Sequence, residues 1–174
     1  MDAHVTKAEE ERYAELQRMA LDFARGGENE ELEKMIMAGM PVNLADEKGN
    51  TLLMLAAYHG ETETVQMLLR HGADPDRRND RGQTPLGGVA FKGFAGVAEL
   101  LVDAGADLHA DNGAGMKPVH FAAMFGRFEI VRLLEARGSP LEGKPGFGRR
   151  LMPFIARMVG RLRFRFSSLM GRKA

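Results

Sequence analysis

The sequence repeats itself every 33 residues, and no other feature constrains the fold as tightly. Glycine, alanine and leucine all recur at this spacing. A period of this length is typical of small units that cannot bury an apolar face alone and must stack on one another. The sequence therefore predicts a solenoid. The recurring sets are Gly49, Gly82 and Gly115; Gly60, Gly93 and Gly126; Gly72, Gly105 and Gly138; Ala57, Ala90 and Ala123; and Leu68, Leu101 and Leu134.

The middle period indicates how each unit is built. Thr84-Pro85 is typical of a helix start, because the hydroxyl accepts a backbone N–H and the proline ring presets φ. The sequence predicts a first helix from Pro85 to about Lys92 and a second from about Ala95 to Ala104, each ended by a glycine. The following stretch is expected to be an exposed turn. We therefore predict an all-α fold of stacked helix–turn–helix pairs with projecting turns.

Within each period the residues resemble those of the ankyrin repeat family. The family pattern Asp-x-x-Gly-x-Thr-Pro-Leu-His-x-Ala-Ala, followed later by Val-x-x-Leu-Leu-x-x-Gly-Ala-Asp, is matched in part three times. The resemblance implies an ankyrin-repeat solenoid with projecting β-turn loops and repeats over residues 46–78, 79–111 and 112–142. The matching segments are residues 46–57 with 68–74, residues 82–86 with 100–107, and residues 117–123 with 130–134.

The copies depart from the family pattern in places. Gly87-Gly88 stand where the motif has His-x, at a cost of about 1 kcal/mol per glycine in helix propensity, so this helix is a candidate weak point of the stack. Lys117 replaces the capping threonine in the third copy. Only His120 keeps the motif histidine, and we expect it to hydrogen-bond to turn backbone.

Residues 1–45 are predicted to form a divergent helical capping unit. The apolar spacing predicts one helix over residues 6–25, with Tyr13, Leu16 and Ala20 on one stripe, and another over residues 28–38. Glutamates dominate the outer face, as expected of a polar repeat at the end of a stack. We interpret them as a solvated cap and not as a binding site. They are Glu9, Glu10, Glu11, Glu28, Glu30, Glu31 and Glu33.

The chain has no net charge, but its charges are unevenly distributed. All 24 acidic residues lie at or before Glu142, together with 15 of the 24 basic ones, so residues 1–142 carry −9 and residues 143–174 carry +9. Three interpretations of residues 143–174 stay open. They could form a degenerate cap helix, a basic amphipathic helix that attaches to an anionic membrane or nucleic acid, or a tail that folds on a partner.

The sequence offers no candidate for catalysis. It has no cysteine, none of its five histidines is spaced to share a metal with another, and no phosphate loop or nucleophile elbow is present. We therefore expect no enzymatic activity, metal, cofactor or small-molecule substrate. No apolar run has the length of a membrane span, and the acidic N-terminal segment lacks a signal-like apolar region. These features predict a cytoplasmic protein.

The resemblance also implies where a partner would bind. In ankyrin-like stacks the turn tips and the exposed part of each first helix form one concave surface, and we carry this over position by position. The candidate residues are Glu47, Lys48, Asn50, Asp80, Arg81, Gln83, Ala114 and Met116 on the turns, and Tyr58, His59, Phe91, Lys92, Met124 and Phe125 on the first helices.

Tyr58, Phe91 and Met124 are 33 residues apart, so stacking should align them in one row. Large apolar side chains at solvent-facing positions are typical of a binding stripe, although such rings could also simply cover the core between repeats. We expect a non-enzymatic module that binds another protein on its concave face, as scaffold, adaptor or inhibitor. The alternative is electrostatic attachment to an anionic membrane or nucleic acid through residues 143–174.

Overall fold

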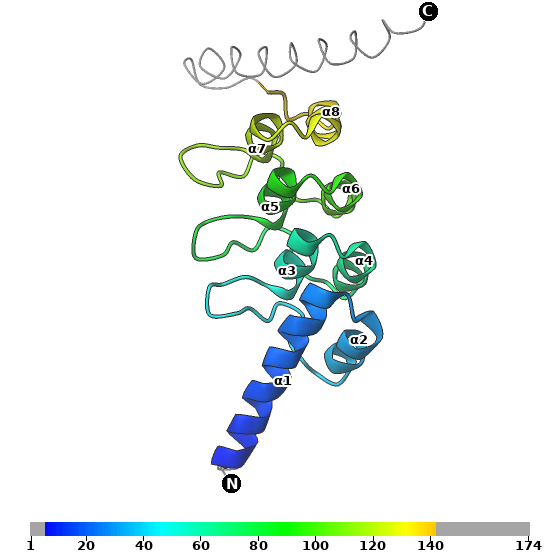
Figure 1. The fold of residues 1–174 in the computed structure, drawn as a ribbon, viewed down its shortest axis with the longest axis vertical. Coiled ribbons are helices and arrows are strands. Elements are labelled where there is room, and N and C mark those ends of the chain that lie inside the picture. The colour runs from blue at the N-terminus through cyan, green and yellow to red at the C-terminus, as the bar shows by residue number, and fades with distance from the viewer. Residues whose placement is uncertain (1–5, 142–174) are drawn as a thin grey trace, which may run out of the picture.

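The computed structural model of the chain describes residues 6–141. In that range eight helices form two parallel rows (Figure 1). In the first row α1 packs on α3, α3 on α5 and α5 on α7, while α2, α4, α6 and α8 stack behind them in the second row. Their bounds are α1 Lys7–Gly26, α2 Asn29–Met37, α3 Leu52–His59, α4 Thr62–Arg70, α5 Pro85–Lys92, α6 Ala95–Asp103, α7 Pro118–Met124 and α8 Phe128–Ala136.

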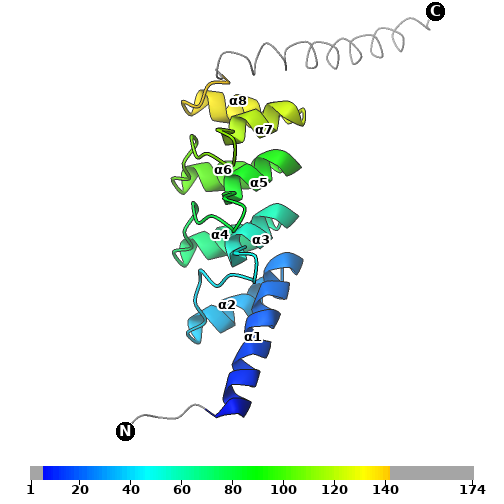
Figure 2. The ribbon, with the colours of Figure 1, turned by 90° about the vertical axis from the view of Figure 1, so that its left-hand side faces the viewer.

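This architecture is the predicted all-α solenoid. Figure 2 shows the helix pairs one above another along the long axis, and in Figure 1 the turns between consecutive pairs project from the same side of the first row. The predicted cap helix and basic face of residues 143–174 lie outside the described residues.

The helices of the middle period begin and end close to where the sequence predicts. α5 spans Pro85–Lys92, and the Thr84 hydroxyl accepts the Gly87 N–H at 3.2 Å. Gly93 ends this helix with a φ of 100°, a left-handed conformation that costs glycine little because it has no Cβ. α6 ends at Asp103, one residue before the predicted end.

The residues that recur in the sequence are the ones that the stack buries. Leu68, Leu101 and Leu134 are fully buried in the second row. In the first row the alanines at positions 57, 90 and 123 are buried as well, and their small side chains allow neighbouring helices to approach closely. Because every pair buries its apolar face against the next pair, the core runs through the stack without interruption.

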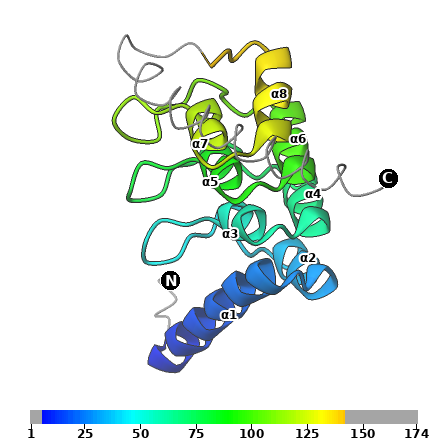
Figure 3. The same ribbon diagram turned by 45° about the horizontal axis from the view of Figure 1, so that its top comes forward.

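The first helix differs from all others in the described range. α1 has 20 residues, against 7 to 9 in the others, and its N-terminal part projects beyond the stack (Figure 3). Only the C-terminal part of its apolar stripe is buried, with Ala20 and Ala24 at 0% exposure, whereas Tyr13 is 47% exposed. The projecting end is closed by a capping box, in which Glu9 accepts the Thr6 N–H at 2.7 Å. This hydrogen bond lowers the pKa of Glu9.

Candidate functional site

A groove of about 680 Å³ runs between the projecting turns and the first-row helices α3 and α5. We call it the turn groove, and we use concave face for the turn groove together with the exposed parts of α3, α5 and α7. The groove is lined by Arg25, Asp46, Lys48, Asn50, Met54, Leu55, Tyr58, His59, Asn79, Asp80, Arg81, Gln83, Thr84, Gly87, Gly88, Phe91, Asn112 and Phe121.

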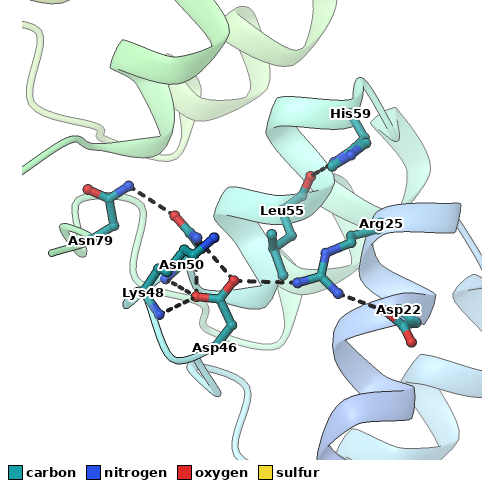
Figure 4. A network of polar contacts seen from close by, with 8 residues as sticks. All are labelled: Asp22, Arg25, Asp46, Lys48, Asn50, Leu55, His59 and Asn79. Carbon is teal, nitrogen blue, oxygen red and sulfur yellow. Dashed lines mark hydrogen bonds and ion pairs between the residues drawn. The ribbon is translucent and has the colours of Figure 1, made fainter. Parts of the chain in front are cut away.

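At one end of the turn groove, Asp46 organises the first turn (Figure 4). Its Oδ1 accepts the N–H groups of Lys48 and Asn50, both at 2.9 Å, and its Oδ2 lies 3.4 Å from Nη2 of Arg25. Burial by itself would raise the pKa of Asp46. The hydrogen bonds from Asn50 and Lys48 and the charge of Arg25 outweigh burial, so the pKa lies below its ordinary value.

Hydrogen bonds join the first turn to the second. The Asn79 side chain donates to Oδ1 of Asn50 at 2.9 Å, and the Asp80 N–H donates to the Lys48 carbonyl at 3.0 Å. Gly49 is required at this contact, because a Cβ there would lie 2.8 Å from Oδ1 of Asp80 and 3.0 Å from its backbone nitrogen. The two turns therefore form a firm wall for the groove.

Aromatic side chains stand exposed on the opposite side of the groove, with Tyr58 and Phe91 in its lining and Phe125 beside it. Tyr58, Phe91 and Phe125 are 40%, 37% and 43% exposed. They make diagonal contacts between repeats: Nζ of Lys92 lies 4.8 Å from the Tyr58 ring centre, and the Phe91 and Phe125 rings meet edge to face at 4.5 Å. The rings thus support one another while leaving a large part of each surface open.

The floor of the groove is unusual at α5. Gly87 is the third residue of this helix, and a Cβ there would lie 2.1 Å from Oδ1 of Asn112. Asn112 comes from the next turn and is buried. Its Oδ1 accepts the Thr84 N–H at 2.7 Å and the Thr84 hydroxyl at 3.1 Å, while its Nδ2 donates to the Ala110 carbonyl. The missing side chain of Gly87 therefore makes room for an acceptor from the neighbouring repeat.

Because Asn112 turns inward, the third turn is organised differently from the first two. In the first two turns, Asp46 and Asn79 accept the N–H groups two and four residues further on. Asn112 is the equivalent residue by the 33-residue step. In the third turn, however, the acceptor is Asp111, which accepts the N–H groups of residues 113 and 115. The shift leaves Ala114 with a φ of 55°, which is uncommon for a residue other than glycine.

His120 has the predicted type of contact. It is the third residue of α7, and its Nδ1 accepts the Lys117 N–H at 3.0 Å, so it bonds to the backbone where the turn enters the helix. Burial, together with the nearby charge of Lys117, lowers the pKa of His120. The neutral ring that accepts this hydrogen bond is thereby favoured.

The structure gathers part of the predicted binding set in the turn groove. Tyr58 and Phe91 lie there, but Met124 is only partly exposed and does not line the groove, whereas Phe125 is exposed beside Phe91. Asn50 and Gln83 are half-buried and hydrogen-bonded within the turns. The predicted residues that line the groove are Lys48, Asn50, Tyr58, His59, Asp80, Arg81, Gln83 and Phe91; Glu47, Lys92, Ala114, Met116, Met124 and Phe125 lie outside its lining.

Sequence reasoning missed Arg25, Asp46 and Asn112, which all line the groove. Gly87-Gly88 were noted only as a weak point of a helix. Their position in the motif was the available signal, since the equivalent residues on both sides are large: Met54-Leu55 in α3 and His120-Phe121 in α7. A pair of glycines between two large pairs indicates a depression in a stacked surface.

In residues 6–141 no group of three or more Asp, Glu or His side chains is arranged to hold a metal ion. None of the helices in that range has the length and apolar character needed to cross a membrane.

Comparison with known proteins identifies the family. A family model described as ankyrin repeats in three copies matches residues 19–112, more than half of the chain, and a second ankyrin-repeat model matches residues 96–135. The chain belongs to the ankyrin repeat family. Repeats of this family are generally protein–protein interaction modules and typically carry no enzymatic activity.

A protein of Pseudomonas aeruginosa that is named as an ankyrin repeat protein is 50% identical to this chain over 38 residues. The match covers 22% of this chain and 22% of that protein. The chain therefore spans less than a quarter of the length of this curated relative, and the likeness concerns little more than one repeat.

Proposed function

We propose that this chain binds another protein through its concave face and performs no chemistry of its own. In binding this partner the chain would act as a scaffold, an adaptor or an inhibitor. The observation that carries the proposal is a set of exposed aromatic side chains in or beside the turn groove: Tyr58 in α3, Phe91 in α5 and Phe125 directly after α7.

Exposed rings at these positions have two physical explanations. They cover the junctions between repeats, and the contacts of Tyr58 with Lys92 and of Phe91 with Phe125 support that role. Each ring nevertheless leaves more than a third of its surface open, and exposed apolar area beside a groove is typical of a binding surface. We therefore expect the buried edges to support the stack and the open faces to bind the partner.

The experiment is affinity purification with the double variant Tyr58→Ala/Phe91→Ala, accompanied by thermal unfolding. Proteins retained by the unchanged chain should be lost from the variant, because hot-spot aromatic residues commonly contribute 2 kcal/mol or more each, on the order of a 30-fold loss in affinity. The thermal midpoint should change little, since both side chains are partly exposed.

Phe128→Ala is the matched control. Phe128 is 44% exposed, as the groove rings are, but it begins α8 in the second row and does not line the turn groove. The control should retain the captured proteins. Equal losses from both variants, or a large drop in stability of the double variant with capture intact, would count against the concave face as the binding surface.

A further inference from the structure

The turn groove has a notch one residue wide above Gly88. The equivalent residues on the two neighbouring first-row helices are Leu55 and Phe121, and both line the groove. Among residues 6–141, and apart from the adjacent residues and the backbone of its own helix, a Cβ on Gly88 would have one neighbour within 4 Å. That neighbour is Cδ2 of Tyr58 at 3.4 Å, which is ordinary van der Waals contact. Unlike the space at Gly87, which Asn112 fills, the space above Gly88 is therefore open to a side chain from outside.

The walls of the notch are apolar. Leu55 and Phe121 flank it along the stack, and Tyr58 and Phe91 are 40% and 37% exposed at its rim. A site with this lining favours a large aliphatic or aromatic side chain, because burying such a group removes its apolar surface, and that of the rim, from water.

The net charge of the groove lining is opposite in sign to that of residues 1–142 as a whole. That part of the sequence carries −9, yet the groove is lined by Arg25, Lys48 and Arg81 against only Asp46 and Asp80. Arg25 and Asp46 pair with each other.

Within the described range, Lys48 and Arg81 remain as the unpaired cations of the lining, and Lys92, outside the lining, lies over the Tyr58 ring. Among residues 6–141, no carboxylate lies within ion-pair distance of Lys48, Arg81 or Lys92, while Asp80 is the one anion of the lining that is likewise unpaired. The groove lining is therefore cationic once the Arg25–Asp46 pair is set aside. Salt screens a ligand in contact with these side chains from acidic residues more than about 10 Å away.

We propose that the turn groove binds an acidic segment of a partner protein, which inserts one large apolar side chain into the notch above Gly88 and sets flanking carboxylates against Lys48, Arg81 and Lys92. This inference rests on the proposed function and specifies the chemistry of the partner. It also disfavours the chain's own residues 143–174 as the occupant, since they carry +9 and would meet like charge in the groove.

The test is selection of a library of randomised short peptides, displayed on phage, against the full chain. The enriched peptides should contain an acidic stretch around a single Leu, Met, Phe or similar residue. Gly88→Leu should weaken the Kd of a selected peptide by about 10- to 100-fold, because the new side chain occupies the space of the anchor. The same variant should be more resistant to urea than the unchanged chain, because leucine replaces glycine within a helix.

Gly96→Leu is the matched control. Gly96 is also a helical glycine, in α6 of the second row, and a Cβ there would meet no atom within 4 Å from the described part of the chain beyond its own helix and adjacent residues. It should gain stability as Gly88→Leu does and bind the selected peptides with unchanged Kd. The charge contribution is tested by Lys48→Glu/Arg81→Glu, which should reduce binding by tenfold or more. Because like charges then face each other, added salt should no longer weaken binding as it does for the unchanged chain.

The outcomes separate this inference from the proposed function. Selected peptides that need Tyr58 and Phe91 but are basic, or that bind Gly88→Leu unchanged, would overturn the inference and leave the concave face as the binding surface. Peptides that bind Tyr58→Ala/Phe91→Ala as well as the unchanged chain would overturn both. Failure of any acidic peptide with an apolar anchor to be enriched would also overturn the inference.

Discussion

The second and third repeats solve the same structural problem in different ways. Each first-row helix needs acceptors for the N–H groups at its start, since these have no partner within the helix. In α7 the third residue, His120, reaches back to the Lys117 N–H. In α5 the third residue is Gly87, which has no side chain, and Asn112 of the next turn accepts the Thr84 N–H instead.

This difference shows that one helix start can depend on the following repeat. The Asn112 side chain occupies the space that a side chain on Gly87 would need, and it accepts the Thr84 N–H from there. Gly88, one residue further, has no such neighbour and remains an opening of the turn groove. Two adjacent glycines therefore have separate roles: the first permits a contact between repeats, and the second shapes the candidate binding surface.

The largest expected effect comes from breaking the contact between repeats. Asn112→Ala would leave the buried Thr84 N–H without this acceptor, and Gly87→Ala would push the Asn112 side chain out of its site. We expect each change to lower the free energy of unfolding by about 1–3 kcal/mol, as for a buried donor left unsatisfied. Urea unfolding monitored by circular dichroism measures both.

The two changes should not be additive, because each removes the same hydrogen bonds. The double variant Gly87→Ala/Asn112→Ala should be less destabilised than the sum of the single variants. Gly96→Ala, on an exposed helical position, should instead gain up to about 1 kcal/mol in helix propensity. A Gly87→Ala protein as stable as Gly96→Ala would mean that Asn112 and Gly87 are not coupled.

A smaller effect is expected where the third repeat lacks its capping hydroxyl. Thr51 and Thr84 accept N–H groups of Met54 and Gly87 at 3.1 Å and 3.2 Å, whereas Lys117 has no hydroxyl at this position. Lys117→Thr should raise the free energy of unfolding by about 0.5–1 kcal/mol, and Thr84→Ala should lower it by about 1 kcal/mol or more. Thermal unfolding of both variants measures the effect: the midpoint should rise for Lys117→Thr and fall for Thr84→Ala.

The smallest effect concerns the pH dependence of stability. Burial first, and the charge of Lys117 second, lower the pKa of His120 from its ordinary value of 6.5. As the pH falls below about 6.5, the unfolded chain therefore takes up a proton that the folded chain does not, and the free energy of unfolding falls. The loss should be complete once the pH is below the pKa of the folded protein.

His120→Gln keeps an acceptor at this position and should remove that part of the pH dependence, measured by urea unfolding between pH 8 and about pH 5. Lys117→Thr removes the nearby charge and should make the loss shallower. An unchanged slope in His120→Gln would assign the pH dependence to other groups.

The parts of this fold that were predictable are those that depend on local sequence. Thr84-Pro85 and Gly93 limit α5 because capping and backbone freedom act within one turn of helix. Leu68, Leu101 and Leu134 could be predicted to be buried because the spacing of apolar residues indicates which face of a helix packs on its neighbours.

The composition of the turn groove was only partly predictable, since it depends on which side chains of different repeats meet. The 33-residue step aligned Asn112 with Asp46 and Asn79 and gave no sign that Asn112 turns inward while Asp111 organises the turn. It aligned Tyr58 with Phe91 correctly, but the contacts run diagonally between neighbouring repeats, from Tyr58 to Lys92 and from Phe91 to Phe125.

The sequence by itself determined that this chain is a stack of helix pairs, because a repeated apolar face must be buried against a copy of itself. Only the tertiary structure decided which gaps between repeats are filled and which are open. The space at Gly87 is occupied and the space at Gly88 is not, although the two residues are identical and adjacent. The reason is physical: a cavity belongs to several segments at once, and whether it is filled depends on where a distant side chain such as Asn112 comes to lie.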